Sequence, residues 1–193
     1  MTHTNHTNNK LPKVLLVITC YNYEKFVGKA IESTLNQTYN NLEVVVINDG
    51  STDGSLGVIR NYQDKIRIIN RENRGIVFTR NEAISLAVDN SQYLCFLDAD
   101  DYFDSNYISD MVQIAEQTNA DIVYPNWHIF GDKDEDVKFS KFDIQKLIEH
   151  EIHCTAESLI RVNAIGQNRF ESEVVAEDWD FFLGLALKDK KFV

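Results

Sequence analysis

Two aspartates separated by a single residue are the strongest candidates for chemistry in this sequence. The stretch Asp98-Ala99-Asp100 directly follows a short apolar run. Extended backbone directs residues i and i+2 to the same side, so one carboxylate can bind a metal ion while the other reaches a neighbouring hydroxyl. Oxygen ligands of this kind favour Mg²⁺ or Mn²⁺, with coordination sites left open for a diphosphate. The alternative is a solvated acidic turn.

A second acidic group, Glu177-Asp178-Trp179-Asp180, precedes an apolar segment with helical spacing. Acidic side chains are favoured at the amino terminus of a helix, which is the simpler explanation of this group. A carboxylate beside an aromatic ring can also act as a general base toward a sugar hydroxyl. The group is therefore a second candidate site, although Trp179 could equally be a core residue.

Two further polar residues stand where a ligand could be bound. Asp49 ends a strand-like run, and its carboxylate could accept an N–H group of a base, whereas Ser51 to Asp53 are more simply explained as a helix cap. Arg80 follows Gly75 on a predicted helix, where its guanidinium could pair with the acidic residues or with phosphate oxygens. A surface ion pair is the alternative for Arg80.

The elements that must position these residues alternate along the chain. Segments with helical spacing follow each of four strand-like runs, which cover residues 13–19, 42–48, 65–69 and 92–97. The first two runs are apolar on both faces, as parallel strands covered by helices on both sides must be. We therefore expect a three-layer, Rossmann-like α/β/α fold with a mostly parallel sheet. Ligands of such sheets bind beyond the carboxyl ends of the strands, where the polar clusters stand.

The remaining chain is predicted in less regular terms. A helix is expected near residues 105–118, and a strand at 121–126 should end at Pro125 or lie at an edge of the sheet. A charged loop is expected at 129–140. Helices should follow near 142–152 and 177–188. Residues 1–12 are polar without apolar periodicity, so we expect a disordered tail followed by one domain, residues 13–193.

Composition excludes several classes of protein. Thirty acidic against nineteen basic residues give a net charge of -11, which disfavours general binding to nucleic acid or to anionic membranes. Apolar runs are too short to cross a bilayer as a helix, and no signal peptide is evident. Three widely spaced cysteines favour reduced thiols, and with them a cytoplasmic location.

These segments, taken in order, resemble the family 2 glycosyltransferases of the GT-A fold. The resemblance runs from about Lys13 to the last residue. Its five matching segments are VITCYNYEKFVGKAIESTLNQTY, VVVINDGSTDGS, NRGIVFTRNEAI, FLDADDYF and AEDWDFFLGLA. One match alone would be weak evidence, whereas five in the same order are strong. The resemblance implies an inverting, metal-dependent transfer of a sugar from a nucleotide sugar, with UDP as the expected nucleotide, to a glycan or lipid-linked acceptor.

The resemblance also implies roles for single residues. Thr19 and Tyr21 would border the nucleotide base, Asp49 would bind the uracil, and Arg80 would lie near the base and the diphosphate. Asp98-Ala99-Asp100 matches the DxD motif of the family, in which the first aspartate faces the donor and the second binds the metal. Glu177-Asp178 matches the ED motif on the acceptor side, beside Trp179, with Asp178 as the general base.

Departures from the family pattern leave alternatives open. Family members usually continue beyond the ED helix, so we expect a chain cut short on the acceptor side. Such a chain could be a noncatalytic module that binds the nucleotide sugar and needs a partner, and peripheral association with a membrane-bound assembly would fit that case. A nucleotidyltransferase is the other alternative, but it normally needs a glycine-rich, basic phosphate loop, which residues 19–26 lack.

Overall fold

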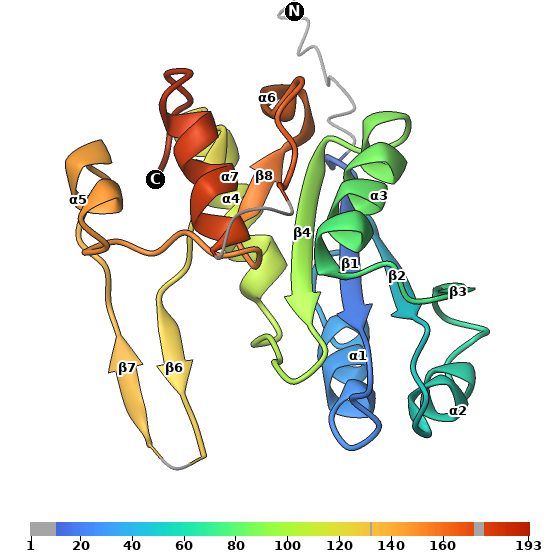
Figure 1. Cartoon of the computed structure of the whole chain (residues 1–193). Coiled ribbons are helices and arrows are strands. Elements are labelled where there is room, and N and C mark those ends of the chain that lie inside the picture. Colours follow the sequence, from blue (N-terminus) through green and yellow to red (C-terminus); the bar gives the residue numbers. More distant parts are fainter. Residues whose placement is uncertain (1–10, 132, 172–175) are drawn as a thin grey trace, which may run out of the picture.

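A six-stranded sheet, in the order β3-β2-β1-β4-β8-β5, lies at the centre of this computed structural model (Figure 1). The structure describes residues 11–131, 133–171 and 176–193, so most of the predicted amino-terminal tail lies outside the described residues. The strands of the sheet are β1 (Val14–Cys20), β2 (Leu42–Asp49), β3 (Arg67–Arg71), β4 (Tyr93–Asp98), β5 (Ile122–Val123) and β8 (Leu159–Arg161).

The sheet is parallel except at β8. β1 pairs in parallel with both β2 and β4, and β2 pairs in parallel with β3. β8 runs antiparallel to both of its neighbours, β4 and β5. The ends of β1, β2 and β4 therefore meet at one edge, which is where the sequence predicts the site.

Helices cover both faces of the sheet. They are α1 (Val27–Leu35), α2 (Ser55–Arg60), α3 (Ile76–Val88), α4 (Tyr107–Thr118), α5 (Ile144–Ile148), α6 (Val162–Ile165) and α7 (Glu177–Ala186). Buried residues of α1, α2 and α4 share one hydrophobic cluster with the sheet. Those of α3, α5, α6 and α7 share the other. The predicted three-layer α/β/α fold is confirmed.

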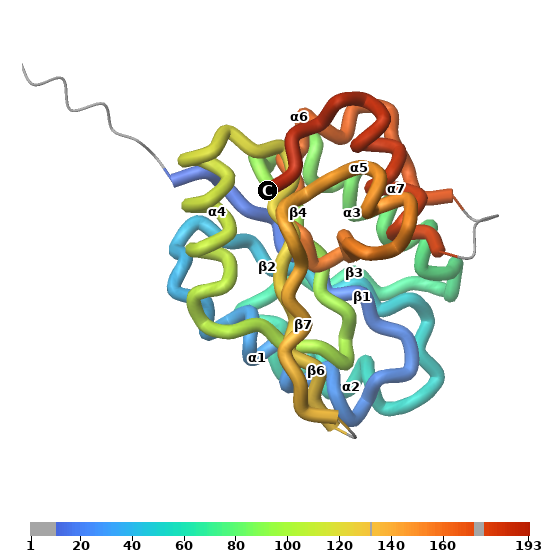
Figure 2. The backbone as a smooth tube through the Cα atoms, turned by 90° about the vertical axis from the view of Figure 1, so that its left-hand side faces the viewer, coloured from blue at the N-terminus to red at the C-terminus, as the bar shows by residue number. Residues whose placement is uncertain are grey.

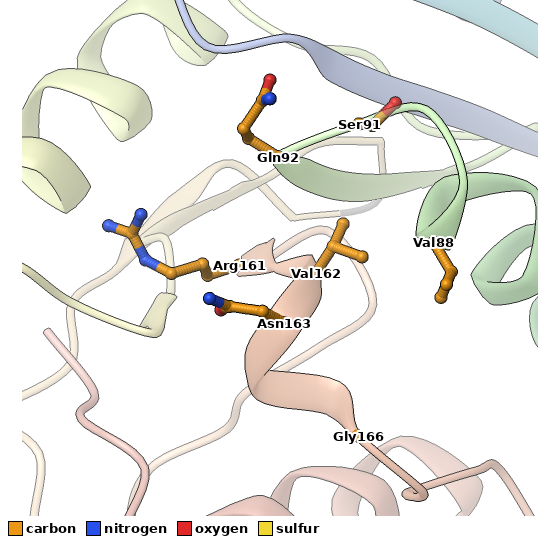
Figure 3. A pocket seen from close by; sticks show the side chains of 7 residues that line it. All are labelled: Val88, Ser91, Gln92, Arg161, Val162, Asn163 and Gly166. Carbon is orange, nitrogen blue, oxygen red and sulfur yellow. The ribbon is translucent and has the colours of Figure 1, made fainter.

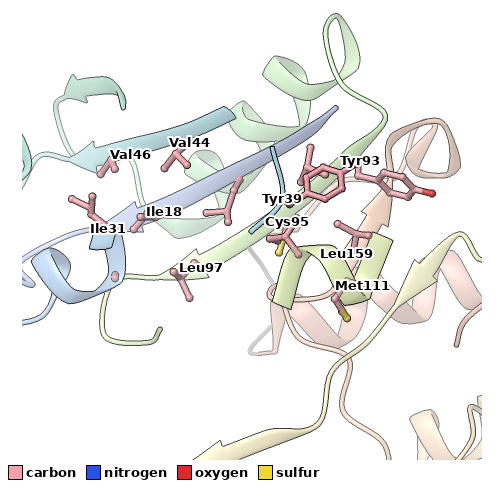
Figure 4. Close-up of a cluster of buried hydrophobic side chains, with 14 of the residues drawn as sticks. Ile18, Ile31, Tyr39, Val44, Val46, Tyr93, Cys95, Leu97, Met111 and Leu159 are labelled. Atoms are coloured by element: carbon pink, nitrogen blue, oxygen red, sulfur yellow. The ribbon is translucent and has the colours of Figure 1, made fainter. Parts of the chain in front are cut away.

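The side chains of β1 explain the two-sided core. All seven of its residues are buried, and its apolar residues alternate between the two clusters, with Leu16 and Ile18 in one and Leu15 and Val17 in the other. Figure 4 shows the first cluster, in which Ile18 lies near Ile31 of α1. A strand buried on both faces has no polar alternation, so its apolar run follows from its central place.

The predicted charged loop at 129–140 is wrong in part, because a hairpin occupies this region. β6 (Trp127–Ile129) pairs antiparallel with β7 (Glu135–Val137), and the pair projects from the body of the molecule at the lower left of Figure 1. Figure 2 views the molecule from that side, so the two strands overlap the body there. Most of its side chains are exposed, so the apolar alternation that marks a half-buried strand is missing. The Trp127 ring packs edge-on against Phe139, with 5.0 Å between ring centroids.

Other boundaries also differ from the prediction. β3 lies two residues later than the predicted run 65–69. α5 is much shorter than residues 142–152, because the Asp143 side chain caps its start and His150 adopts a positive φ of 59° soon after its end. Pro125 follows β5, the edge strand, as predicted. β8 and α6 were not predicted, since each has only three or four residues.

Two further observations concern the cysteines and the search for a membrane-spanning helix. Cys20, Cys95 and Cys154 are all free and buried, in agreement with the predicted thiols. Among the described residues, no helix has both the length and the apolar character that crossing a membrane requires.

Candidate active site

A pocket of about 360 Å³ lies at the carboxyl edge of the parallel strands. Its walls come from the ends of β1, β2 and β4, from the start of α3 and from the first residue of α7. Seven predicted site residues line it: Thr19, Tyr21, Asp49, Arg80, Asp98, Ala99 and Glu177. Asp100, Asp178 and Trp179 do not line this pocket, although Asp178 is bonded to Arg80, which does.

A second hollow, of about 380 Å³, lies at the opposite edge of the sheet, between the end of α3 and the start of α6 (Figure 3). Its lining residues are Val88, Ser91, Gln92, Arg161, Val162, Asn163 and Gly166. No carboxylate lines it, and it lies at the amino end of β4. The chemistry predicted from the sequence therefore belongs to the first pocket.

The first aspartate of the DxD motif is held by β1. Thr19 and Asp98 are register partners at the ends of neighbouring strands, and the Thr19 hydroxyl donates a hydrogen bond of 2.9 Å to the Asp98 carboxylate. Asp98 is also half-exposed to the pocket, with 39% of its side chain accessible. Its carboxylate therefore has a fixed orientation and remains open to a ligand.

Asp49 is almost fully buried and fixes the loop that follows β3. Its carboxylate accepts hydrogen bonds from the backbone N–H groups of Arg74 and Gly75, each at 2.9 Å, and from the guanidinium of Arg71. Gly75 precedes α3 and has a positive φ of 85°, which favours glycine. Asp49 thus lines the pocket and also shapes its wall.

Arg80 connects the two acidic motifs. Its side chain is only 4% exposed, so the alternative of a surface ion pair is wrong. Nη1 donates to the carboxylates of Glu177, at 2.9 Å, and of Asp178, while Nη2 lies 3.4 Å from Asp98. The buried cation of Arg80 therefore joins the DxD motif to the ED motif, which stand far apart in the sequence.

Asp178 lies in the first turn of α7, as the simpler explanation of the ED group expects, but its carboxylate also makes contacts outside this helix. One carboxylate oxygen contacts Arg80 and the other accepts the backbone N–H of Ala156 at 3.1 Å. Burial raises the pKa of Asp178 to about 6, against the lowering effect of Arg80 and of the Ala156 hydrogen bond, while Asp98 and Glu177 raise it further. Such a pKa suits a general base near neutral pH.

Trp179 is anchored in the fold. Its indole N–H donates a 2.8 Å hydrogen bond to the carbonyl of Leu147, and its ring stacks on His150 with 5.0 Å between centroids. The ring therefore links α7 to α5. The alternative of a core residue fits this position better than direct contact with the pocket.

The acidic rim carries an excess of negative charge, which bears on the predicted metal. Partial burial and the charges of Asp100 and Asp98 raise the pKa of Asp101 to about 6. Within the described part of the chain, no three His, Cys, Asp or Glu residues are placed to form a metal-binding group. Mg²⁺ is commonly held by one or two carboxylates together with water and substrate phosphates. Asp98 and Asp100 supply carboxylate oxygens of the kind that such a partial shell uses.

Sequence reasoning missed one acidic residue of this region. Burial and the neighbouring charges of Asp98 and Asp178 raise the pKa of Glu157 to about 7, which places its carboxylate near both motifs. Glu157 lies two residues before the start of β8, and Ala156 three. No pattern in the sequence marks this segment, because β8 itself was not predicted.

Comparison with solved structures identifies the class of this fold as GT-A. The structure of S. aureus TarS 1-349 in complex with UDP-GlcNAc matches 94% of this chain and 56% of that chain, with a TM-score of 0.78 and 20% identity. Mannosyltransferase PcManGT from Pyrobaculum calidifontis, in complex with GDP-Man and Mn²⁺, matches 96% of this chain and 55% of that chain, with a TM-score of 0.71 and 16% identity.

Sequence comparison identifies the family. Residues 15–174 match Glycosyl transferase family 2, and the chain belongs to that family. It is 33% identical over 121 residues to UDP-Glc:alpha-D-GlcNAc-diphosphoundecaprenol beta-1,3-glucosyltransferase WfaP from Escherichia coli. The matched region covers 62% of this chain and 47% of WfaP. The chain spans only 18% to 48% of the length of five curated relatives that it matches.

Proposed function

We propose that this chain transfers a sugar from a UDP-sugar to an acceptor hydroxyl, with inversion at the anomeric carbon. The observation that carries this proposal is the pocket at the carboxyl edge of the sheet, which Asp49 lines and in which Arg80 joins the DxD and ED motifs. UDP as the nucleotide is supported by WfaP, named for UDP-Glc, and by TarS, solved with UDP-GlcNAc.

The donor is proposed to bind along the ends of β1, β2 and β4. Tyr21 is 45% exposed and provides an aromatic face at the pocket, and Thr19 lies beside it. The Asp49 oxygen that accepts only the Gly75 N–H keeps acceptor capacity for an N–H of uracil. Ala99, between the two DxD aspartates, also lines the pocket, while its small side chain is buried in the first hydrophobic cluster.

Asp98 and Asp100 are the proposed ligands of a Mn²⁺ or Mg²⁺ ion. A divalent ion bound there supplies positive charge that stabilises the diphosphate leaving group. The complex of PcManGT with Mn²⁺ supports a metal in this fold. The excess of carboxylates over basic groups at the rim gives the same indication from the electrostatics of this chain.

Asp178 is the proposed general base. It accepts the proton of the acceptor hydroxyl, whose oxygen then forms a bond to the anomeric carbon on the face opposite the diphosphate. The bond from that carbon to the diphosphate oxygen breaks, and UDP leaves. The raised pKa of Asp178, about 6, makes the carboxylate a stronger base than an ordinary aspartate while leaving it ionised at pH 7.

The acceptor is proposed to be a glycan or a lipid-linked sugar, in line with the diphosphoundecaprenol acceptor in the name of WfaP. Glu177 lines the pocket on the side of α7 and is the proposed acceptor-side contact, whereas Trp179 supports α7 from α5. A membrane-bound assembly as partner and a cytoplasmic location stay predictions. A noncatalytic donor-binding fragment is the alternative proposal, and a test for sugar transfer separates the two.

A donor screen tests this proposal. Melting temperature is measured with UDP-, GDP-, CMP- and dTDP-sugars, each with and without Mn²⁺, and transfer is followed by release of the free nucleotide diphosphate. We expect stabilisation by UDP-sugars that depends on Mn²⁺ and is lost in Asp98→Asn. Asp89→Asn, an exposed aspartate at the opposite edge of the sheet, is the matched control. Stabilisation by none of the nucleotides would refute donor binding, and stabilisation without transfer would favour the noncatalytic alternative.

A further inference from the structure

The buried guanidinium of Arg80 makes contacts within the protein that a residue binding the nucleotide diphosphate would not need. We infer that Arg80 is a positioning residue, which holds the carboxylates of Asp178 and Asp98 in their working orientation, and that it is not a ligand of the nucleotide diphosphate. This inference rests on the proposed function, because Asp178 is the proposed base. It departs from the expectation that Arg80 binds the donor.

The hydrogen-bond donors of Arg80 are largely occupied by protein. Nη1 serves both Glu177 and Asp178, and Nη2 faces both oxygens of Asp98, at 3.4 and 3.5 Å. Nε is buried without a hydrogen-bond partner in the structure. The edge of the guanidinium nearest the DxD motif thus already meets a carboxylate, and the remaining N–H group, at Nε, is not accessible to solvent.

Charge balance gives Arg80 a further task. Burial lowers the pKa of the Arg80 guanidinium, and the charges of Asp178, Asp98, Glu177 and Glu157 together raise it by more. Removing one partner from a buried ionic cluster leaves uncompensated charge, which is strongly unfavourable. Without Arg80, Asp178 would lose the opposite charge that keeps it ionised against the effects of burial.

The neighbour of Arg80 on α3 supports a positioning role. The Asn81 side chain donates to the carbonyl of Phe170, at 2.9 Å, and accepts from its N–H, at 3.0 Å. The Phe170 ring in turn lies 5.5 Å from the Arg80 guanidinium carbon and stacks on Phe181 of α7. α3 therefore holds the segment before α7 by two adjacent residues, and α7 carries Asp178.

Arg80→Lys is the informative variant, because lysine keeps the charge but cannot bridge carboxylates with a planar fork. We expect kcat for transfer to fall about 10- to 100-fold, as for a misplaced catalytic group, while the dissociation constant for UDP changes less than about threefold. Arg71→Lys should give the reverse pattern, since Arg71 supports Asp49 and the pocket wall. Arg60→Lys, on the exposed side of α2, is the control that should leave both constants unchanged.

A second measurement does not depend on transfer. The Asp178 carboxyl carbon is titrated by NMR in chain labelled with ¹³C-aspartate, with the signal assigned by its loss in Asp178→Asn. In Arg80→Met the pKa should rise, and in Arg80→Lys it should rise less. An unchanged pKa in both variants, or weakened UDP binding at unchanged kcat in Arg80→Lys, would overturn the inference. If the wild-type chain neither binds UDP nor transfers sugar, the proposed function fails, while the titration still decides the role of Arg80.

Discussion

Replacing Asp178 by asparagine is the most direct test of the proposed chemistry. The carboxylate accepts one hydrogen bond from Arg80 and one from the Ala156 N–H, so an amide in either orientation turns its NH₂ group toward a donor. One hydrogen bond is therefore lost, which should lower the free energy of unfolding by about 1.5–3 kcal/mol, the usual contribution of a hydrogen bond to a charged group. The amide also cannot accept the acceptor proton, and we expect kcat to fall about 100- to 10,000-fold.

The assay follows UDP release in the presence of acceptor, together with UDP binding by calorimetry. UDP affinity should be almost unchanged in Asp178→Asn, because Asp178 does not line the donor pocket. Asp180→Asn is the matched control, since it makes the same change two residues further along α7 and should leave both constants near wild type. Transfer by Asp178→Asn at the wild-type rate would refute the assignment of the base.

Three further predictions concern pH, metal and the pocket wall. Because the base works ionised, kcat should fall about tenfold per pH unit below the Asp178 pKa of about 6 and level off above it, and a flat profile from pH 4.5 to 8 would contradict this. EDTA should abolish UDP-induced stabilisation, and Asp100→Asn should raise the Mn²⁺ concentration needed to restore it at least about tenfold. Gly50→Ala should lower the free energy of unfolding by about 1–2 kcal/mol in urea titrations, since Gly50 has a φ of 73° and the added Cβ would lie 2.4 Å from the Asn73 backbone nitrogen. Gly57→Ala, on α2 with open space around the new Cβ, should instead stabilise by up to about 1 kcal/mol.

The parallel half of the fold could be predicted because its central strands β1, β2 and β4 are mostly buried on both faces. Apolar runs such as the one in β1 have no other stable place in a small domain, so they indicate central strands. The other half could not be predicted in the same way. β8 has three residues, and β6 and β7 are largely exposed, so their pairing depends on tertiary contacts that leave no periodic pattern.

The candidate site could be predicted where its residues directly end strands. Thr19, Asp49 and Asp98 follow this rule, and the structure brings all three to one pocket. Contacts between side chains could not be predicted, because they depend on distances across the fold. The predicted pairing of Arg80 with acidic residues is confirmed, but its burial between the two motifs and the position of Glu157 near them were not predicted.

The reversed direction of β8 has a consequence for how such chains can diversify. Because β8 runs opposite to β4, the residues that precede β8 lie at the edge of the sheet where β4 ends. The Ala156 N–H contacts Asp178 at this edge. The proposed donor side of the site is therefore built from segments that follow the strands β1, β2 and β4. The proposed acceptor side includes a segment that precedes a strand, β8. Insertions between β7 and β8 can therefore change the proposed acceptor side and leave the proposed donor side unchanged.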